Sequence, residues 1–128
     1  MRLLLDTHTF LWFISGDRRL SNEARVLIEN TDNSRLLSVA SLWEIAIKMS
    51  MGKLNLGLPF AEFVPQQLNR NLIDLIGITI SQMDVVASLP FHHKDPFDRL
   101  LIAQAIVEQL PIISADMAFD NYGVNRLW

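Results

Sequence analysis

The sequence predicts an α/β fold in which helices cover both faces of a mostly parallel sheet. Short apolar segments and amphipathic segments alternate along the whole chain, which is the pattern of consecutive β–α–β units. Half of the 128 residues are hydrophobic and 20% are charged, a composition that excludes disordered and collagen-like chains. At this length we expect one domain over residues 1–128, built as a three-layer α/β/α sandwich with four to five strands.

Short apolar runs mark the strands. Arg2–Leu5 and Arg35–Ser38 are too short for helices, and Ile112–Ser114 follows a proline that ends the segment before it. We also expect a short strand over Ile78–Ile80 and a last one within Val124–Trp128.

Helical spacing of apolar residues marks the segments between these strands. Ser21 is placed to cap one helix, and Pro65 should kink or divide another because proline lacks the amide hydrogen that a helix needs. A short helix is also expected after Asp116. The predicted main helices are Thr7–Ser15, Ser21–Asn30, Ser41–Gly52, Phe60–Arg70, Ser81–Leu89 and Asp98–Leu110.

Acidic residues stand close to the ends of several predicted strands. Asp6 closes the first strand, Glu44 lies one turn into the helix after the second, and Asp116 follows the strand that starts at Ile112. Asp98 opens the helix that leads to that strand, with Asp95 just before it. Because ligands of parallel α/β sheets gather at the carboxyl ends of the strands, we expect these carboxylates to converge there.

Helix capping is the competing explanation of these acids. Ser41 to Glu44 has the spacing of a capping box, and Asp95 followed by proline is an acidic N-cap with a second acid, Asp98, three residues on. Asp116 is placed to cap the short helix after it. Asp6 has no such role in this interpretation, and an unpaired carboxylate at the end of an apolar strand is costly. Asp6 therefore supports a functional site most directly.

Converging carboxylates repel one another unless some are protonated or a divalent cation lies between them. Oxygen ligands in a chain without cysteine favour Mg²⁺ or Mn²⁺ over zinc. Such an ion activates water and stabilises charge on a phosphodiester. Nucleophile-elbow, Walker and dinucleotide-binding motifs are absent, which disfavours the corresponding chemistries.

Four blocks of the sequence resemble the PIN-domain family, and more specifically its VapC-like toxin branch. The resemblance spans nearly the whole chain, with the blocks in family order. They are Leu3–His8, Ser38–Lys48, His93–Ala105 and Ile112–Asp116, the last with Phe119, Tyr122 and Gly123 behind it. Ser114 stands where the family usually has threonine, which preserves the hydroxyl.

The resemblance implies a Mg²⁺-dependent endoribonuclease that leaves a 5′-phosphate and a 3′-hydroxyl. It carries the catalytic acids over onto Asp6, Glu44, Asp98 and Asp116, with Asp6 and Asp98 as metal ligands. Asp95 is an additional acid, and we favour Asp98 over Asp95 as the ligand because Asp95 is better placed to cap. Further substrate or ion-pair contacts are expected from Thr7, Ser41, Arg99 and Ser114.

The same resemblance implies a toxin held inactive by an antitoxin segment laid across the active-site groove, and a homodimer. No apolar run reaches the roughly 18 residues of a membrane span, and Asp6 interrupts the first apolar stretch, so we expect a cytoplasmic protein without membrane contact.

Two other functions fit parts of the sequence. Phosphoryl transfer through an aspartyl-phosphate at Asp6 is disfavoured because His8, not an acid, stands two residues on. The other alternative is a non-catalytic protein-binding module whose acids only cap helices. His92 and His93 are expected to be surface or loop residues, and Lys48 to pair with Glu44 four residues before it.

Overall fold

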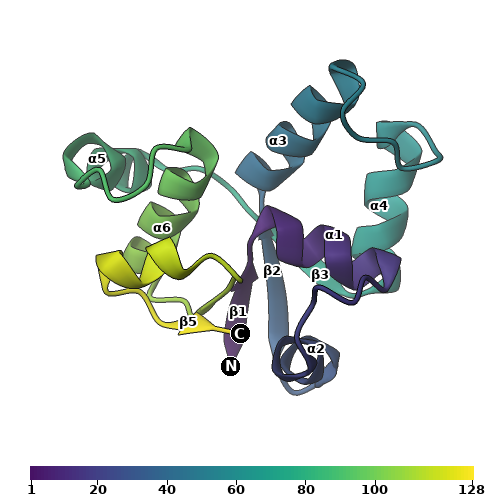
Figure 1. Cartoon of the computed structure of the whole chain (residues 1–128), viewed down its shortest axis with the longest axis horizontal. Helices are drawn as coiled ribbons and strands as arrows, with labels where there is room; N and C mark the ends of the chain where they lie inside the picture. The colour runs from purple at the N-terminus through teal and green to yellow at the C-terminus, as the bar shows by residue number, and fades with distance from the viewer.

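A computed structural model describes residues 1–128 and contains one five-stranded sheet (Figure 1). The strand order is β3-β2-β1-β4-β5, and all four pairings are parallel. The predicted parallel sheet is therefore confirmed. The strands are β1 (Arg2–Leu5), β2 (Ser34–Ser38), β3 (Ile73–Ile76), β4 (Ile112–Ile113) and β5 (Arg126–Leu127).

Six α-helices and one 3₁₀ helix connect the strands and cover both faces of the sheet. Figure 1 shows α1 and α4 on one side of the strands and α5 and α6 on the other. The helices are α1 (Thr7–Ser15), α2 (Asn22–Glu29), α3 (Val39–Ser50), α4 (Phe60–Arg70), α5 (Ile80–Ser88), α6 (Pro96–Glu108) and the 3₁₀ helix η1 (Met117–Tyr122). No helix is long and apolar enough to cross a membrane.

The central strand β1 shows why its sequence is continuously apolar. Leu3 and Leu5 pack into a core cluster with Phe10 of α1, whereas Leu4 packs into a second cluster with Ile102 of α6. All five side chains are fully buried. Side chains of a strand alternate between faces, so a strand covered by helices on both sides must be apolar at every position.

Helix α3 begins earlier than predicted, and the predicted capping box is wrong. Ser38, the last residue of β2, is the N-cap, and its hydroxyl accepts a hydrogen bond from the Ala40 amide at 3.0 Å. The strand passes directly into the helix, so Ser41 and Glu44 lie inside it. Glu44 is thereby released from any capping role.

The strand predicted over Ile78–Ile80 is also wrong, because β3 lies earlier, at Ile73–Ile76. Thr79 instead caps α5, and Gln82 completes a reciprocal capping box with it. A Thr-x-x-Gln pattern outcompetes the β propensity of the isoleucines that flank the threonine. Helix α4 continues through Pro65 without a break.

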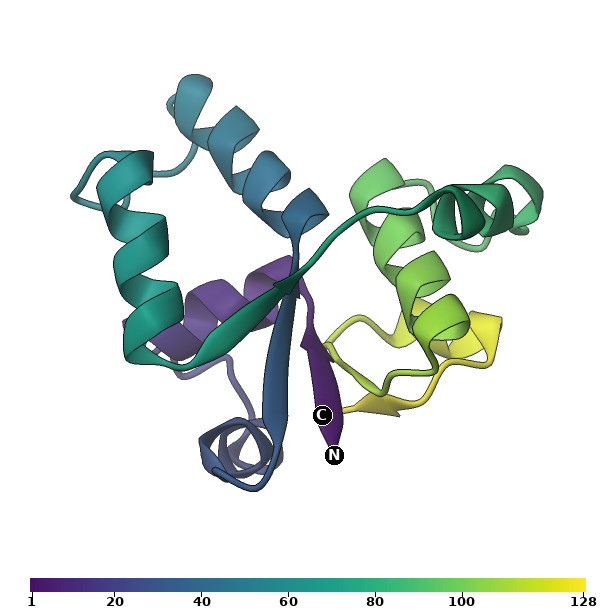
Figure 2. The same cartoon turned by 180° about the vertical axis from the view of Figure 1, so that it is seen from behind.

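The carboxyl ends of the strands bring distant parts of the chain together. Figure 2 shows α3 and α6 at the edge of the sheet that these carboxyl ends form, one helix on either side of it. Asp6 follows β1 directly, α3 follows β2 directly, and Asp116 lies three residues beyond the end of β4.

Candidate active site

Asp6 is buried, 5% exposed, at the junction of β1 and α1. Its Oδ1 accepts a hydrogen bond from the Thr9 amide at 2.8 Å, so Asp6 is the N-cap of α1. The expectation that Asp6 has no capping role is therefore wrong. Capping engages Oδ1, and burial still raises the pKa of the carboxyl above 3.8 despite hydrogen bonds from Ser114 and Thr9.

Asp95 and Asp98 divide two roles at the start of α6. Asp95 Oδ1 accepts hydrogen bonds from the amides of Phe97 at 2.8 Å and Asp98 at 3.0 Å, which makes Asp95 the N-cap. Asp98 lies in the first turn, and its Oδ2 is 3.1 Å from His93 Nε2. The predicted capping role of Asp95 is confirmed. Capping engages only Oδ1 of Asp95, and Asp98 makes no capping contact, so both side chains retain a carboxylate oxygen for a ligand.

Asp116 and Ser114 connect the end of β4 to Asp6. Asp116 caps η1 as predicted, since its Oδ1 accepts a hydrogen bond from the Ala118 amide at 3.0 Å. The Ser114 hydroxyl accepts from the Asp116 amide at 3.0 Å and also hydrogen-bonds the Asp6 side chain. Ser114 is fully buried. It therefore fixes two of the predicted site residues relative to each other.

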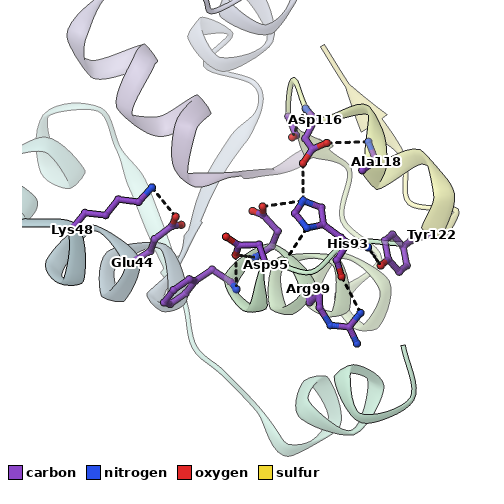
Figure 3. Close-up of polar contacts among 11 residues, drawn as sticks. Glu44, Lys48, His93, Asp95, Arg99, Asp116, Ala118 and Tyr122 are labelled. Atoms are coloured by element: carbon purple, nitrogen blue, oxygen red, sulfur yellow. Dashed lines mark hydrogen bonds and ion pairs between the residues drawn. The ribbon is translucent and has the colours of Figure 1, made fainter. Parts of the chain in front are cut away.

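Glu44 projects from the second turn of α3, and its side chain is 10% exposed. Its Oε2 forms the predicted i,i+4 ion pair with Lys48, at 3.0 Å (Figure 3). The pair holds the glutamate rotamer while its other carboxylate oxygen has no hydrogen-bond partner within the protein.

The raised pKa of Asp98 indicates that other acids lie close to it. Burial raises the pKa of this carboxyl to about 7, and the negative charges of Asp95, Asp6 and Glu44 add to the increase, against a lowering by His93. The ordinary value is 3.8. Asp6 after β1, Glu44 in α3 and the N-cap acid of α6 are thus close enough to disfavour the ionisation of Asp98, as the sequence predicted.

His93 is a site residue that sequence reasoning missed. It lies in the loop before α6, as expected, but its side chain is only 15% exposed, and Nε2 contacts both Asp98 and Asp116. Ligand atoms of these three residues lie within 4.8 Å of one another, so they form a group able to hold a metal ion. A histidine two residues before a capping aspartate has no periodic pattern that marks it in the sequence. The contacts with Asp98 and Asp116 that place His93 in the site appear only in the folded chain.

Three of the residues expected to make substrate or ion-pair contacts form hydrogen bonds within the protein. The buried Thr7 hydroxyl donates to the buried Ser41 hydroxyl at 2.9 Å, tying α1 to α3. Arg99 is 5% exposed and donates to backbone carbonyls of Val86, Leu89, Pro90 and His93, with no ion pair. These contacts position the helices and the loop before α6, and they engage both terminal nitrogens of the Arg99 guanidinium.

Fold and site together define a class: parallel α/β proteins with a cluster of carboxylates at the carboxyl edge of the sheet. Comparison with known proteins makes the class specific. The PIN domain matches residues 3–125, and this chain belongs to the PIN-domain family.

Two curated relatives place the chain near the VapC branch of that family. It is 30% identical over 115 residues to ribonuclease VapC22 of Mycobacterium tuberculosis, covering 89% of this chain and 86% of the relative. It is 47% identical over 49 residues to ribonuclease VapC16 of the same organism, covering 38% of this chain and 35% of that relative.

Two solved structures share the fold. A VapBC2 crystal structure from Rickettsia felis, bound to promoter DNA, matches with a TM-score of 0.71 and 15% identity over 99% of this chain and 98% of the other. A toxin–antitoxin complex from Klebsiella pneumoniae matches with a TM-score of 0.64 and 17% identity over 98% and 96%. At these identities the likeness concerns the fold.

Proposed function

We propose that this protein is the toxin of a toxin–antitoxin pair, an endoribonuclease that hydrolyses RNA phosphodiester bonds with the help of Mg²⁺ or Mn²⁺. The observation that carries the proposal is the half-buried Asp98, which contacts His93 and whose pKa is raised to about 7 by partial burial and by other carboxylates. Such a cluster gains stability from a divalent cation, and its hard oxygen donors suit Mg²⁺ and Mn²⁺. The ribonuclease relatives support RNA as the substrate.

Asp6 and Asp98 are the residues proposed to hold the ion. When bound, the ion would stabilise negative charge on the phosphodiester and lower the pKa of a water molecule. Asp6 is fixed by the Thr9 amide and by Ser114, so its carboxylate is oriented before any ligand arrives. Preorganised charges of this kind cost little to reorganise during reaction.

Glu44 and Asp116 are proposed to orient the attacking water and take up its proton. The Lys48 ammonium holds Glu44 Oε2, and the Ala118 amide holds Asp116 Oδ1. Each acid is therefore restricted in rotation while retaining an acceptor for a water molecule. Positioning of this type is the main contribution of a protein to hydrolysis of a charged phosphodiester.

A partner antitoxin is supported by the fold shared with a toxin–antitoxin complex. A cavity of about 480 Å³ between α1, α3 and α4 is lined by His8, Trp12, Lys48, Leu54 and Phe63, among others. None of the four proposed catalytic acids lines it, so it lies beside the site and joins it through Lys48. We propose that an apolar antitoxin segment occupies it.

We also propose a homodimer in the cytoplasm. Its support is the number of large apolar side chains at the surface, including Trp43 at 59% and Ile80 at 83% exposure. Sedimentation velocity of the isolated chain should give twice the mass of one protomer. A monomer at micromolar concentration would contradict the dimer and leave the proposal for the acids standing.

The capping-only alternative is favoured by one observation: Asp6, Asp95 and Asp116 all cap helices. Mg²⁺ distinguishes the two functions. If the acids bind the ion, about ten times Kd of Mg²⁺ should raise Tm by about 5 °C, because only the folded chain has the site. Calorimetry with and without Mg²⁺ measures this. The capping-only function predicts no change in Tm.

The activity itself is tested with a defined single-stranded RNA and its fragments resolved by electrophoresis. Cleavage should require Mg²⁺ or Mn²⁺, stop with chelator and leave a 5′-phosphate. Cleavage by Asp6→Asn should fall by about a hundredfold or more, while Tm is kept because asparagine Oδ1 can still accept from Thr9. Cleavage that persists in chelator at the wild-type rate would contradict the proposal.

A further inference from the structure

The His93 imidazole lies between two of the proposed catalytic carboxylates (Figure 3). Its Nε2 is 2.7 Å from Asp116 Oδ2 and 3.1 Å from Asp98 Oδ2. These acids come from different elements, since Asp98 belongs to α6 and Asp116 precedes η1. The ring is therefore the direct link between the two parts of the site.

The other ring nitrogen determines which nitrogen carries the hydrogen. The Asp95 amide donates to His93 Nδ1 at 3.2 Å, so Nδ1 acts as an acceptor and has no hydrogen. The ring hydrogen must then be on Nε2, where Asp116 Oδ2 accepts it and Asp98 Oδ2 lies 3.1 Å away. The same contact opposes metal coordination by Nε2, because that would move the hydrogen to Nδ1, against the Asp95 N–H.

Hydrogen bonds hold both backbone polar groups of His93, the amide and the carbonyl. Its amide donates to the Tyr122 hydroxyl at 2.8 Å, and that hydroxyl donates to the Pro90 carbonyl at 2.8 Å. Its carbonyl accepts from the Arg99 guanidinium at 3.3 Å, which also binds the Pro90 carbonyl at 2.9 Å. The loop thus presents the ring in one place, with little freedom to rotate away.

We propose that His93 is a positioning residue that sets the separation of Asp98 and Asp116 by donating from Nε2, and that it is not a metal ligand. The inference rests on the proposed nuclease function of these acids. Partners in the shell around a metal site typically contribute a factor of about 10–100 to metal affinity or activity. His93 is expected to act in this range.

The tautomer can be measured without any RNA. Long-range ¹H–¹⁵N correlation spectra of the metal-free protein should show His93 with its hydrogen on Nε2, assigned by comparison with His93→Gln. Saturating Mg²⁺ should leave that tautomer in place. In the Mn²⁺-loaded protein, electron spin-echo spectroscopy should show no directly bound imidazole nitrogen. A switch to Nδ1–H with Mg²⁺, or a bound nitrogen with Mn²⁺, would overturn the proposal.

A matched pair of variants tests the donor itself. The amide nitrogen of glutamine can reach the place of histidine Nε2, whereas asparagine is too short. We expect His93→Asn to lower kcat by about 10–100-fold and His93→Gln to recover most of it. Equal loss in both variants, with unchanged Tm, would overturn the donor role.

Tyr122→Phe supplies a milder probe that leaves the ring in the protein. Loss of the hydroxyl frees the His93 backbone, so we expect a smaller decrease of kcat than in His93→Asn, with KM unchanged. If wild type itself cleaves no RNA, the nuclease function fails, and the spectra still decide whether His93 donates to the acids.

Discussion

Replacing Asp98 by Asn should abolish RNA cleavage and leave the protein folded. The substitution keeps the size of the side chain and removes the charge that the site needs to bind a cation. We expect kcat/KM to fall by about a hundredfold or more at saturating Mg²⁺. Cleavage of a fluorescent RNA, with Mg²⁺ binding followed by calorimetry, measures both consequences.

Two aspartates provide controls for this variant. Asp120→Asn removes an exposed acid that pairs with Arg126 away from the cluster, and it should cleave RNA at the wild-type rate. Asp95→Asn keeps an oxygen that can cap α6, so its loss of activity should be smaller than that of Asp98→Asn. A larger loss in Asp95→Asn would make Asp95 the ligand and contradict the assignment.

The metal-free protein should become more stable as the pH falls from about 8 to about 4. The pKa of Asp98 is about 7 in the folded chain and 3.8 when exposed, so the folded state binds the proton more tightly over this interval. Stability is lowest above pH 7, where the half-buried Asp98 carboxylate is ionised, and the gain is complete below about pH 4. The difference is at most about 4 kcal/mol. The raised pKa of Asp6 acts in the same direction.

Urea denaturation in chelator at several pH values measures this dependence. In Asp98→Asn the slope between pH 4 and 7 should become smaller, leaving the contribution of Asp6, and at pH 8 that variant should be at least as stable as wild type. Mg²⁺ should stabilise wild type most at high pH, where the acids are ionised. Below about pH 4 the trend reverses, because Asp17 and Asp120 have lowered pKa values beside Arg19 and Arg126. Stability that falls steadily from pH 8 to 4 would contradict the prediction.

The predictable part of this structure is the part that depends on local periodicity. The apolar runs at Arg2–Leu5 and Ile112 predict the central strands, and the rule for carboxyl ends of parallel strands places Asp6, Glu44 and Asp98 at one edge from the sequence alone. The expected ion pair of Lys48 with Glu44 also follows from helix geometry alone.

The errors arose where two local signals competed. Ser38 and Ser41 are both suitable N-caps, and the sequence does not reveal that β2 turns directly into α3 at Ser38. Thr79 among isoleucines suits a strand as well as a cap. His93 was beyond local reasoning, because its partner Asp116 is 23 residues away and the contact depends on the packing of η1 against the loop before α6.

Three acids of this protein, Asp6, Asp95 and Asp116, each begin a helix within the proposed reaction centre. Replacing one of these acids with a residue that cannot cap would therefore destabilise a helix, a cost that does not arise for an acid on a loop. A descendant that lost its nuclease activity would still need an oxygen to accept the first amides of each helix. We expect inactive descendants to carry asparagine or serine there, and alanine to be rare.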